Sequence, residues 1–277
     1  MRTWRAHDGA RLYYEETGSG IPVVFLHPTP LDHAFWGPMV ENLAGVRAIL
    51  PDLRGHGRSE LGTSLPRGGF PRAPNAPALT MAQLGADMTG LLDHLELSSA
   101  VFAGCSIGGY VLLELWRTIP ARMHALAFVC SKPQPDTEAG LEKRAATIAR
   151  ISTEGTSAVF DGMAQTLIGA TARERRPGIV LELRERMTLT AEAAIAVQAG
   201  LAIRPDSVPT AATMDVPVLA IAGGEDPAVT AEEMQAFQAA PGGCEFHLLP
   251  DGGHFTAYEQ PEKVAALVAD WLKQGNV

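Results

Sequence analysis

Residues 100–119 read AVFAGCSIGGYVLLELWRTI, and two structural patterns follow each other within them. Residues 100–105 are apolar or glycine without interruption, which is typical of a strand covered on both faces of a sheet. From Ile107 to Ile119 the apolar residues recur at helical spacing. The two patterns meet at Gly104-Cys105-Ser106-Ile107-Gly108, where glycines permit a strained turn. The stretch predicts a strand, a turn and a helix, with the hydroxyl of Ser106 above the sheet edge.

The same alternation of short apolar runs and longer helical patterns continues along the chain. It is typical of βα units around a mostly parallel sheet with helices on both faces. Buried strands are predicted at residues 22–27, 47–51, 100–105, 125–131 and 217–222, with further strands at 11–16, antiparallel near an edge, and at 245–250. Helices are predicted at 35–43, 81–95, 107–119, 231–239 and 261–273.

Two segments depart from this alternation. Residues 133–206 are rich in alanine and charge and show helical periodicity without a convincing strand. We interpret them as a helical lid inserted between two parts of one core, residues 1–132 and 207–277. Residues 60–79 contain four prolines and three glycines, a composition that excludes regular structure, and we expect this loop to cover part of the site.

Composition and charge limit the possible partners. A chain of 277 residues can bury one large core or two small ones. With a formal net charge of −9, the protein lacks the positive surface that nucleic acid or anionic lipid requires. The three cysteines form no CxxC pair, which argues against disulfides and a zinc site. The first residues lack the blocks of a secretory signal, and no apolar run approaches 18 residues. We expect a cytoplasmic protein that binds neither nucleic acid nor membrane.

A serine hydroxyl is a weak nucleophile that needs an adjacent base and a group to orient that base. Among eight histidines, His254 lies in a turn between the last predicted strand and helix, at the same end of the sheet as Ser106. Asp226 follows the predicted strand 217–222 and is the expected orienting carboxylate. Glu225, Asp215 and Asp251 are alternatives for that role. An idle serine in a glycine-rich connection is the alternative for Ser106.

The negative oxygen that forms when a serine attacks a carbonyl needs backbone N–H donors. Ile107, the first residue of the predicted helix, supplies one. The second is expected after the strand 22–27, where Pro28-Thr29-Pro30 leaves Thr29 as the only residue with an N–H. Prolines that merely end a strand are the alternative reading. Phe35 and Trp36 follow this loop and are candidate substrate-binding residues, with packing in the core as the alternative.

At these residues the chain resembles the α/β-hydrolase superfamily, in particular its enol-lactonase-like and haloperoxidase-like serine esterase branch. The resemblance spans nearly the whole chain and rests on five elements: His27-Pro28-Thr29-Pro30, Asp52-Leu53-Arg54-Gly55-His56-Gly57-Arg58-Ser59, the turn from Gly104 to Gly109, the turn at Asp226, and His254. It implies that Asp52, Arg54 and Ser59 support the fold. Pro28 stands where the family usually has glycine. This departure bears on Thr29 as the second N–H donor, because the donor loop differs from the family's pattern.

The resemblance implies the α/β-hydrolase fold and a serine hydrolase that cleaves a small or medium carboxylic ester or lactone through an acyl-enzyme. Haloalkane dehalogenases and epoxide hydrolases of this fold carry aspartate where this chain has Ser106. No nucleotide-binding loop is visible, and neither a metal nor an organic cofactor is implied. Two alternatives stay open: hydrolysis of carbon–carbon bonds in ring-cleavage products, and ligand binding without catalysis on a hydrolase scaffold.

Overall fold

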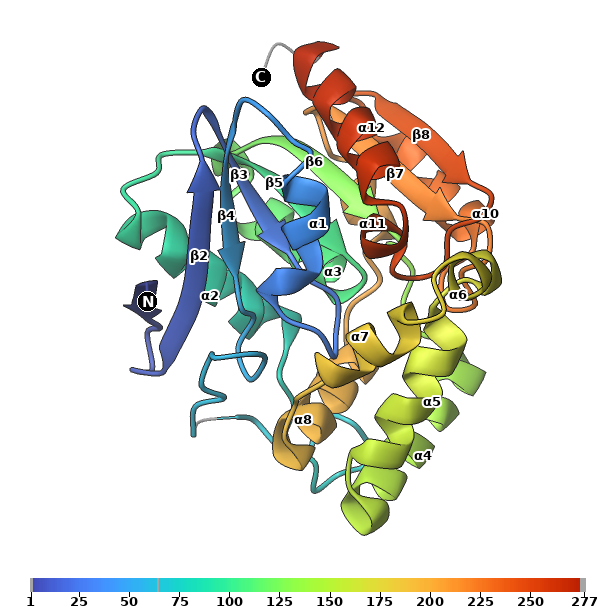
Figure 1. Ribbon diagram of the computed structural model, residues 1–277. Helices are drawn as coiled ribbons and strands as arrows, with labels where there is room; N and C mark the ends of the chain where they lie inside the picture. Colours follow the sequence, from blue (N-terminus) through green and yellow to red (C-terminus); the bar gives the residue numbers. More distant parts are fainter. Residues whose placement is uncertain (1, 64, 275–277) are drawn as a thin grey trace.

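The computed structural model describes residues 2–63 and 65–274 (Figure 1). Within these residues the strands form one sheet, with the bounds β1 (Arg2–Arg5), β2 (Arg11–Gly18), β3 (Ile21–Leu26), β4 (Val46–Pro51), β5 (Ala100–Cys105), β6 (Met123–Val129), β7 (Val218–Gly223) and β8 (Cys244–Leu249). Their order across the sheet is β1-β2-β4-β3-β5-β6-β7-β8. The pairs β1–β2 and β2–β4 are antiparallel, and all the others are parallel. The predicted mostly parallel sheet is therefore confirmed.

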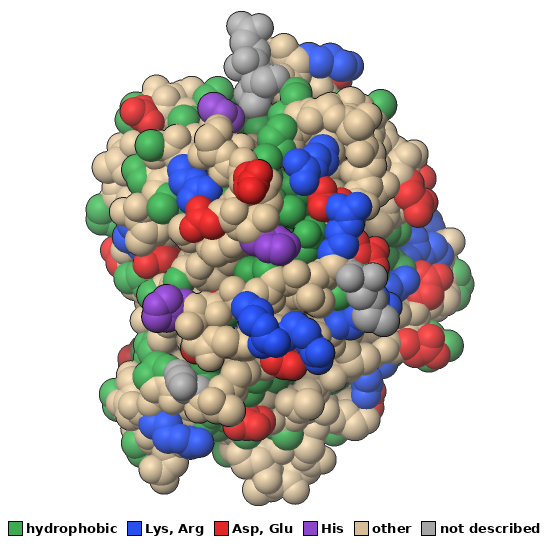
Figure 2. All heavy atoms as spheres, turned by 90° about the vertical axis from the view of Figure 1, so that its left-hand side faces the viewer, with side chains coloured by type: hydrophobic (Ala, Val, Ile, Leu, Met, Phe, Trp, Pro, Cys, Tyr) green, Lys and Arg blue, Asp and Glu red, His purple; other side chains and the backbone are tan. Residues whose placement is uncertain are grey.

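The central strands are the continuous apolar runs that the sequence indicates. Every residue of β5 and β7 is buried, because helices cover both faces of the sheet there. The strand β1 was not predicted, since its four residues, Arg-Thr-Trp-Arg, contain no apolar run, and all but Trp4 are exposed at the edge of the sheet. Arg2 and Arg47 both pair with Glu16 on β2, and Figure 2 shows acidic and basic side chains close together on this side of the molecule.

The helices have the bounds α1 (Gly37–Val40), α2 (Met81–His94), α3 (Ile107–Thr118), α4 (Glu138–Glu154), α5 (Ser157–Leu167), α6 (Ala170–Arg175), α7 (Ile179–Glu185), α8 (Ala191–Ala202), α9 (Val208–Ala211), α10 (Ala231–Met234), α11 (Thr256–Glu259) and α12 (Pro261–Gln274), with 3₁₀ helices η1 (His33–Trp36), η2 (Pro120–Arg122) and η3 (Gln235–Ala239). Helices α2 and α3 pack together on one face of the sheet, while α1 and α12 pack together on the other (Figure 1). None of the helices among the described residues combines the length and apolarity needed to cross a bilayer.

Two of the predicted helices are divided in the structure. The predicted helix 35–43 is η1 followed by α1, because Pro38 lacks the N–H that a continuous helix would use at that point. The predicted helix 231–239 is α10 followed by η3. Its start is well defined: Thr230 accepts a bond from the N–H of Glu233, whose side chain accepts one from the N–H of Thr230 in return.

Between β6 and β7 the chain forms helices α4 to α9, and most of this block lies beyond the carboxyl ends of the strands (Figure 1). The loop 60–79 packs against this block rather than over the serine. Phe70 and Ala78 form a small apolar cluster with Ile148 of α4 and Ala199 of α8. None of the loop's described residues lines the cavity that contains Ser106. The expectation that this loop covers the site is therefore wrong, because its apolar side chains pack against helices α4 and α8.

Candidate active site

Ser106 occupies a strained turn between β5 and α3. Its backbone angles are φ 52° and ψ −116°, a conformation that a non-glycine residue adopts only when the surroundings enforce it. A β-carbon on Gly108 would lie 2.2 Å from the carbonyl oxygen of Leu26, and one on Gly104 would lie 2.5 Å from the backbone of Gly108. Glycine is needed at both positions because α3 starts so close to the sheet. The turn places Ser106 on the wall of a cavity.

His254 and Asp226 form a buried pair at the same end of the sheet. Nδ1 of His254 lies 2.8 Å from Oδ2 of Asp226, and since a carboxylate only accepts, Nδ1 carries the proton. The other carboxylate oxygen accepts from the N–H groups of Ala228 and Val229 at 2.8 and 3.1 Å. The Asp226 side chain is fully buried. In the neutral form of the ring, this arrangement leaves Nε2 of His254 as the nitrogen with a free lone pair.

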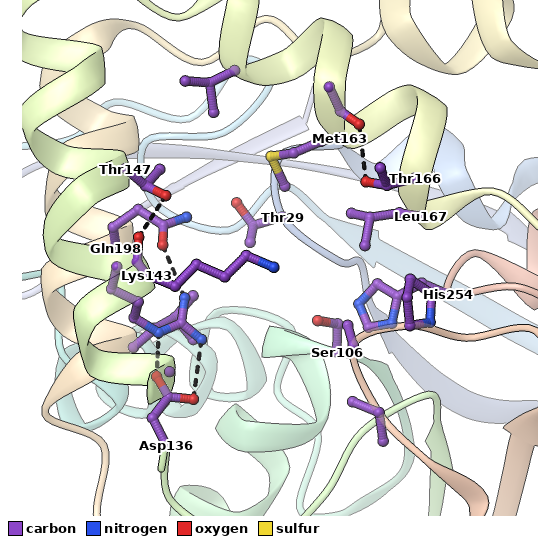
Figure 3. A pocket seen from close by; sticks show the side chains of 18 of the residues that line it. Thr29, Ser106, Asp136, Lys143, Thr147, Met163, Thr166, Leu167, Gln198 and His254 are labelled. Carbon is purple, nitrogen blue, oxygen red and sulfur yellow. Dashed lines mark hydrogen bonds and ion pairs between the residues drawn. The ribbon is translucent and has the colours of Figure 1, made fainter. Parts of the chain in front are cut away.

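Ser106 and His254 line the same cavity, and Figure 3 shows them side by side on its wall. Between these two described residues the structure records no hydrogen bond. Such bonds are often long or misaligned in the absence of substrate, because they tighten in the reacting complex. The other candidate carboxylates lie elsewhere: Glu225 accepts bonds from Thr171, and Asp251 pairs with Arg175. Among the candidates for the acid, Asp226 is thus the residue that contacts His254.

The carboxylate of Glu259 fastens the turn that carries His254. It accepts from the N–H of Gly253 at 2.7 Å and from the N–H of Phe255 at 3.1 Å, on either side of the histidine. It also accepts from the N–H of Gly169 at 3.3 Å, in the segment between α5 and α6. Burial raises the pKa of Glu259 despite these bonds. Sequence reasoning missed this residue, since a glutamate five positions after a histidine carries no distinctive signal.

Thr29 and Ile107 are the residues predicted to supply the N–H donors, and both have a backbone N–H without a recorded partner among the described residues. Ile107 is the first residue of α3, so its N–H has no carbonyl partner within the helix. Thr29 lines the cavity, and the structure records no partner for its N–H among the described residues. Its hydroxyl lies 3.0 Å from Nε2 of His56, whose Nδ1 is bonded to the carbonyl of Arg54. Because Nδ1 of His56 donates to that carbonyl, its Nε2 accepts a hydrogen bond from the Thr29 hydroxyl. This bond holds the Thr29 side chain in place.

The cavity has a volume of about 680 Å³, within the usual range for small-molecule sites. Its wall joins Ser106 and His254 to residues of α4, α5 and α8. Phe35 and Trp36 do not belong to this wall: both are fully buried, Phe35 against Phe255 and Trp36 against Phe25. Their prediction as substrate-binding residues is corrected, because η1 turns these rings into the core beneath the site.

Sequence reasoning also missed the polar residues that α4, α8 and the segment before α4 bring to the cavity. The cavity wall includes Lys143 and Arg144 of α4, Asp136 just before α4, and Gln198 of α8. Each is an ordinary polar residue of an amphipathic helix or loop in the sequence, and only the packing of α4 on α8 brings them together. Among the described residues no group of three or more His, Cys, Asp or Glu side chains is placed to hold a metal ion.

Comparison with known proteins identifies the family. The chain matches the Alpha/beta hydrolase family over residues 23–267 and belongs to it. It is 27% identical to 3-oxoadipate enol-lactonase 1 of Acinetobacter baylyi over 91% of this chain and 88% of that protein. Among solved structures, it resembles a thermophilic esterase from Thermogutta terrifontis with a TM-score of 0.88 and 28% identity over the full length of both chains.

A second solved structure supports the same assignment. The enol-lactonase from Burkholderia xenovorans LB400 matches with a TM-score of 0.84 and 26% identity, over 98% of this chain and 100% of that chain. The predicted α/β-hydrolase fold and the predicted resemblance to enol-lactonases are therefore confirmed. The family and its relatives support a hydrolase of the ester or lactone type.

Proposed function

We propose that this protein is a serine hydrolase that cleaves a small or medium carboxylic ester or lactone through an acyl-enzyme. The observation that carries the proposal is the 2.8 Å bond between Nδ1 of His254 and Oδ2 of Asp226, beside a serine held at φ 52° on the same cavity wall. The esterase and enol-lactonase relatives support the substrate class.

In the acylation step Ser106 attacks the carbonyl carbon of the substrate. His254 takes the hydroxyl proton at Nε2, which the bond from Nδ1 to Asp226 leaves free to accept it. The buried carboxylate then stabilises the imidazolium that forms. His254 returns the proton to the departing alcohol oxygen as its bond to the carbonyl carbon breaks. Water subsequently attacks the acyl-enzyme by the same route and releases the acid and Ser106.

The N–H groups of Ile107 and Thr29 would hold the negative oxygen of the tetrahedral intermediate. A donor of this kind contributes roughly 3 kcal/mol to lowering the barrier. The hydrogen bond from the Thr29 hydroxyl to His56 supports this role, since it fixes the loop at a residue flanked by two prolines. We further propose that residues 133–206 act as the lid of a core formed by residues 1–132 and 207–277, and that this lid shapes the substrate pocket.

Covalent labelling tests the nucleophile. A fluorophosphonate should modify Ser106 in the intact protein, and mass spectrometry of the digested protein identifies the modified residue. Ser106→Ala should abolish labelling and reduce ester or lactone turnover to background, while its thermal unfolding stays close to that of wild type. Labelling at another residue, or turnover that survives in Ser106→Ala, would contradict the mechanism. A panel of esters and lactones graded by chain length, with a vinylogous diketone for carbon–carbon cleavage, then defines the bond that is broken.

A further inference from the structure

The wall of the cavity carries an excess of positive charge. Lys132, Lys143, Arg144 and Arg150 line it together with one carboxylate, that of Asp136. The whole chain has a formal net charge of −9, so this local excess runs against the overall balance. A positively charged pocket wall in an acidic protein points to a negatively charged ligand.

Three of these four cations have partners of opposite charge. Lys132 pairs with Glu233, and Arg150 pairs with Glu154 at 3.0 Å. Arg144 pairs with Asp136 and also donates to Oε1 of Gln198 at 2.9 Å. These contacts commit the three cations to carboxylates of the protein itself.

Asp136 is itself shared between two arginines. Besides Arg144 it contacts the buried Arg204, with Nη1 2.8 Å from its Oδ1. Although burial raises the pKa of Asp136, the bonds and charges of the two arginines outweigh burial and hold the pKa below its usual value. One carboxylate therefore faces two guanidinium groups, and the cluster adds a further positive charge beside the cavity.

Lys143 is the remaining cation, and no ion pair to it is recorded among the described residues. Figure 3 shows its ammonium end directed into the cavity, on the side toward Thr29 and Ser106. Nearby, the Oε1 of Gln198 is occupied by Arg144, which leaves the amide nitrogen of Gln198 as a further donor on the same wall. The opposite wall is largely apolar, with Val159, Met163 and Leu167 of α5.

We propose that Lys143 binds a carboxylate group of the substrate, so that the preferred substrates are esters or lactones that carry a second, ionised carboxyl group. The inference rests on the proposed function, since it assigns a specificity residue to the same cavity. Because the exposed Lys143 has no ion pair recorded among the described residues, its ammonium can exchange solvent for a charge-assisted hydrogen bond to the ligand without breaking an ion pair. The apolar wall of α5 accommodates the methylene groups that join the carboxylate to the reacting carbonyl.

Kinetics on a matched pair of substrates tests the proposal. The phenyl half-ester of adipic acid carries a free carboxylate, and its methyl-capped diester has nearly the same length without the charge. Wild type should prefer the half-ester in kcat/KM. Lys143→Met should lower kcat/KM for the half-ester about tenfold and leave the diester within about twofold, as expected for loss of one charged hydrogen bond. Lys143→Arg should retain the preference, and Lys263→Met, at an exposed lysine of α12, is the control.

A binding measurement separates this proposal from the proposed function. Adipate, the product dicarboxylate, is titrated calorimetrically into Ser106→Ala and into the double variant Ser106→Ala/Lys143→Met. The second variant should bind about tenfold more weakly, whether or not the wild type turns over esters. Equal adipate affinity in the two variants, or equal losses for the half-ester and the diester in Lys143→Met, would overturn the role of Lys143. Absence of fluorophosphonate labelling with intact adipate binding would instead overturn the hydrolase mechanism.

Discussion

Asp226 shows how much of the proposed chemistry depends on one side chain. Its Oδ1 accepts hydrogen bonds from the backbone N–H groups of Ala228 and Val229. Its Oδ2 accepts a hydrogen bond from Nδ1–H of His254. The backbone bonds fix the carboxylate, and the carboxylate in turn fixes the tautomer of the imidazole. A base with the wrong tautomer would present a proton, not a lone pair, to Ser106.

Asp226→Asn should therefore lower kcat by about 10⁴-fold while the fold is retained. The asparagine oxygen would keep the two backbone N–H bonds, and its amide nitrogen would face Nδ1 of His254, which must then give up its proton. Steady-state kinetics on an ester that wild type hydrolyses measures the loss. Asp215→Asn, at an exposed aspartate that was also a candidate from the sequence, should leave kcat unchanged. Turnover of Asp226→Asn within a few fold of wild type would exclude Asp226 as the orienting residue.

At the scale of elements, the turn between β8 and α11 is joined to the end of α5 and to the segment that links α5 to α6. The N–H of His254 donates to the carbonyl of Leu167 at 2.8 Å, and Glu259 accepts from Gly169 as well as from the residues flanking the histidine. The thiol groups of Cys105 and Cys130 also contact the carbonyls of this turn from below. The position of the proposed base is thus set jointly by residues at the ends of β5 and β6 and by residues at the end of α5 and between α5 and α6.

Glu259→Gln tests this connection. Glutamine can accept through only one atom, so its NH₂ group would face a backbone N–H and leave a buried donor without a partner. We expect the variant to lose about 1–3 kcal/mol in free energy of unfolding and to lose kcat more than KM. Urea unfolding and steady-state kinetics measure the two effects. Glu262→Gln, at an exposed position on α12, should change neither quantity. Unaltered stability and kcat in Glu259→Gln would show that the turn is held by its other bonds alone.

The strands other than β1, and the serine turn, could be predicted from sequence because their physical causes are local. Continuous apolar runs such as β5 mark strands covered on both faces, and the glycines around Ser106 mark a close approach of helix and sheet. The cavity wall could not be predicted in this way. Lys143 and Gln198 lie on different helices, and only tertiary packing brings them to one cavity. Phe35 was placed wrongly for the same reason, since its local pattern does not say which way η1 turns it.

For the molecule as a whole, three buried histidines link stability to pH. Burial, reinforced for His27 by the neighbouring His56, lowers the pKa of His27 to about 3, and burial lowers that of His56 to about 4. His33 behaves in the opposite way: burial opposes its charge, but the Asp52 carboxylate, 2.6 Å from its Nδ1, outweighs burial and raises the pKa. His33 therefore adds to the free energy of unfolding. This added stability is fully present below about pH 6.5 and is lost as the pH rises through the raised pKa of His33.

The lowered pKa values of His27 and His56 predict a loss of stability in mild acid. Below about pH 6.5 the unfolded chain takes up protons on both rings while the folded chain does not, so each histidine reduces the free energy of unfolding by roughly 1 kcal/mol per pH unit. The loss continues until the pH approaches about 4 for His56 and about 3 for His27. In His56→Gln, glutamine can still donate to Arg54 and accept from Thr29, but it takes up no proton.

Urea unfolding, followed by tryptophan fluorescence between pH 4.5 and 7.5, measures this slope. Between pH 6 and 4.5 the slope for His56→Gln should be smaller than that of wild type by roughly 1 kcal/mol per pH unit, the share of one histidine. His124→Gln, which removes an exposed imidazole, is the matched control and should follow the wild-type slope. If His56→Gln and wild type lose stability in parallel over this range, then His56 takes up a proton in the folded chain as readily as in the unfolded one. That result would contradict the assignment of a neutral His56 ring whose Nε2 accepts a hydrogen bond from the Thr29 hydroxyl.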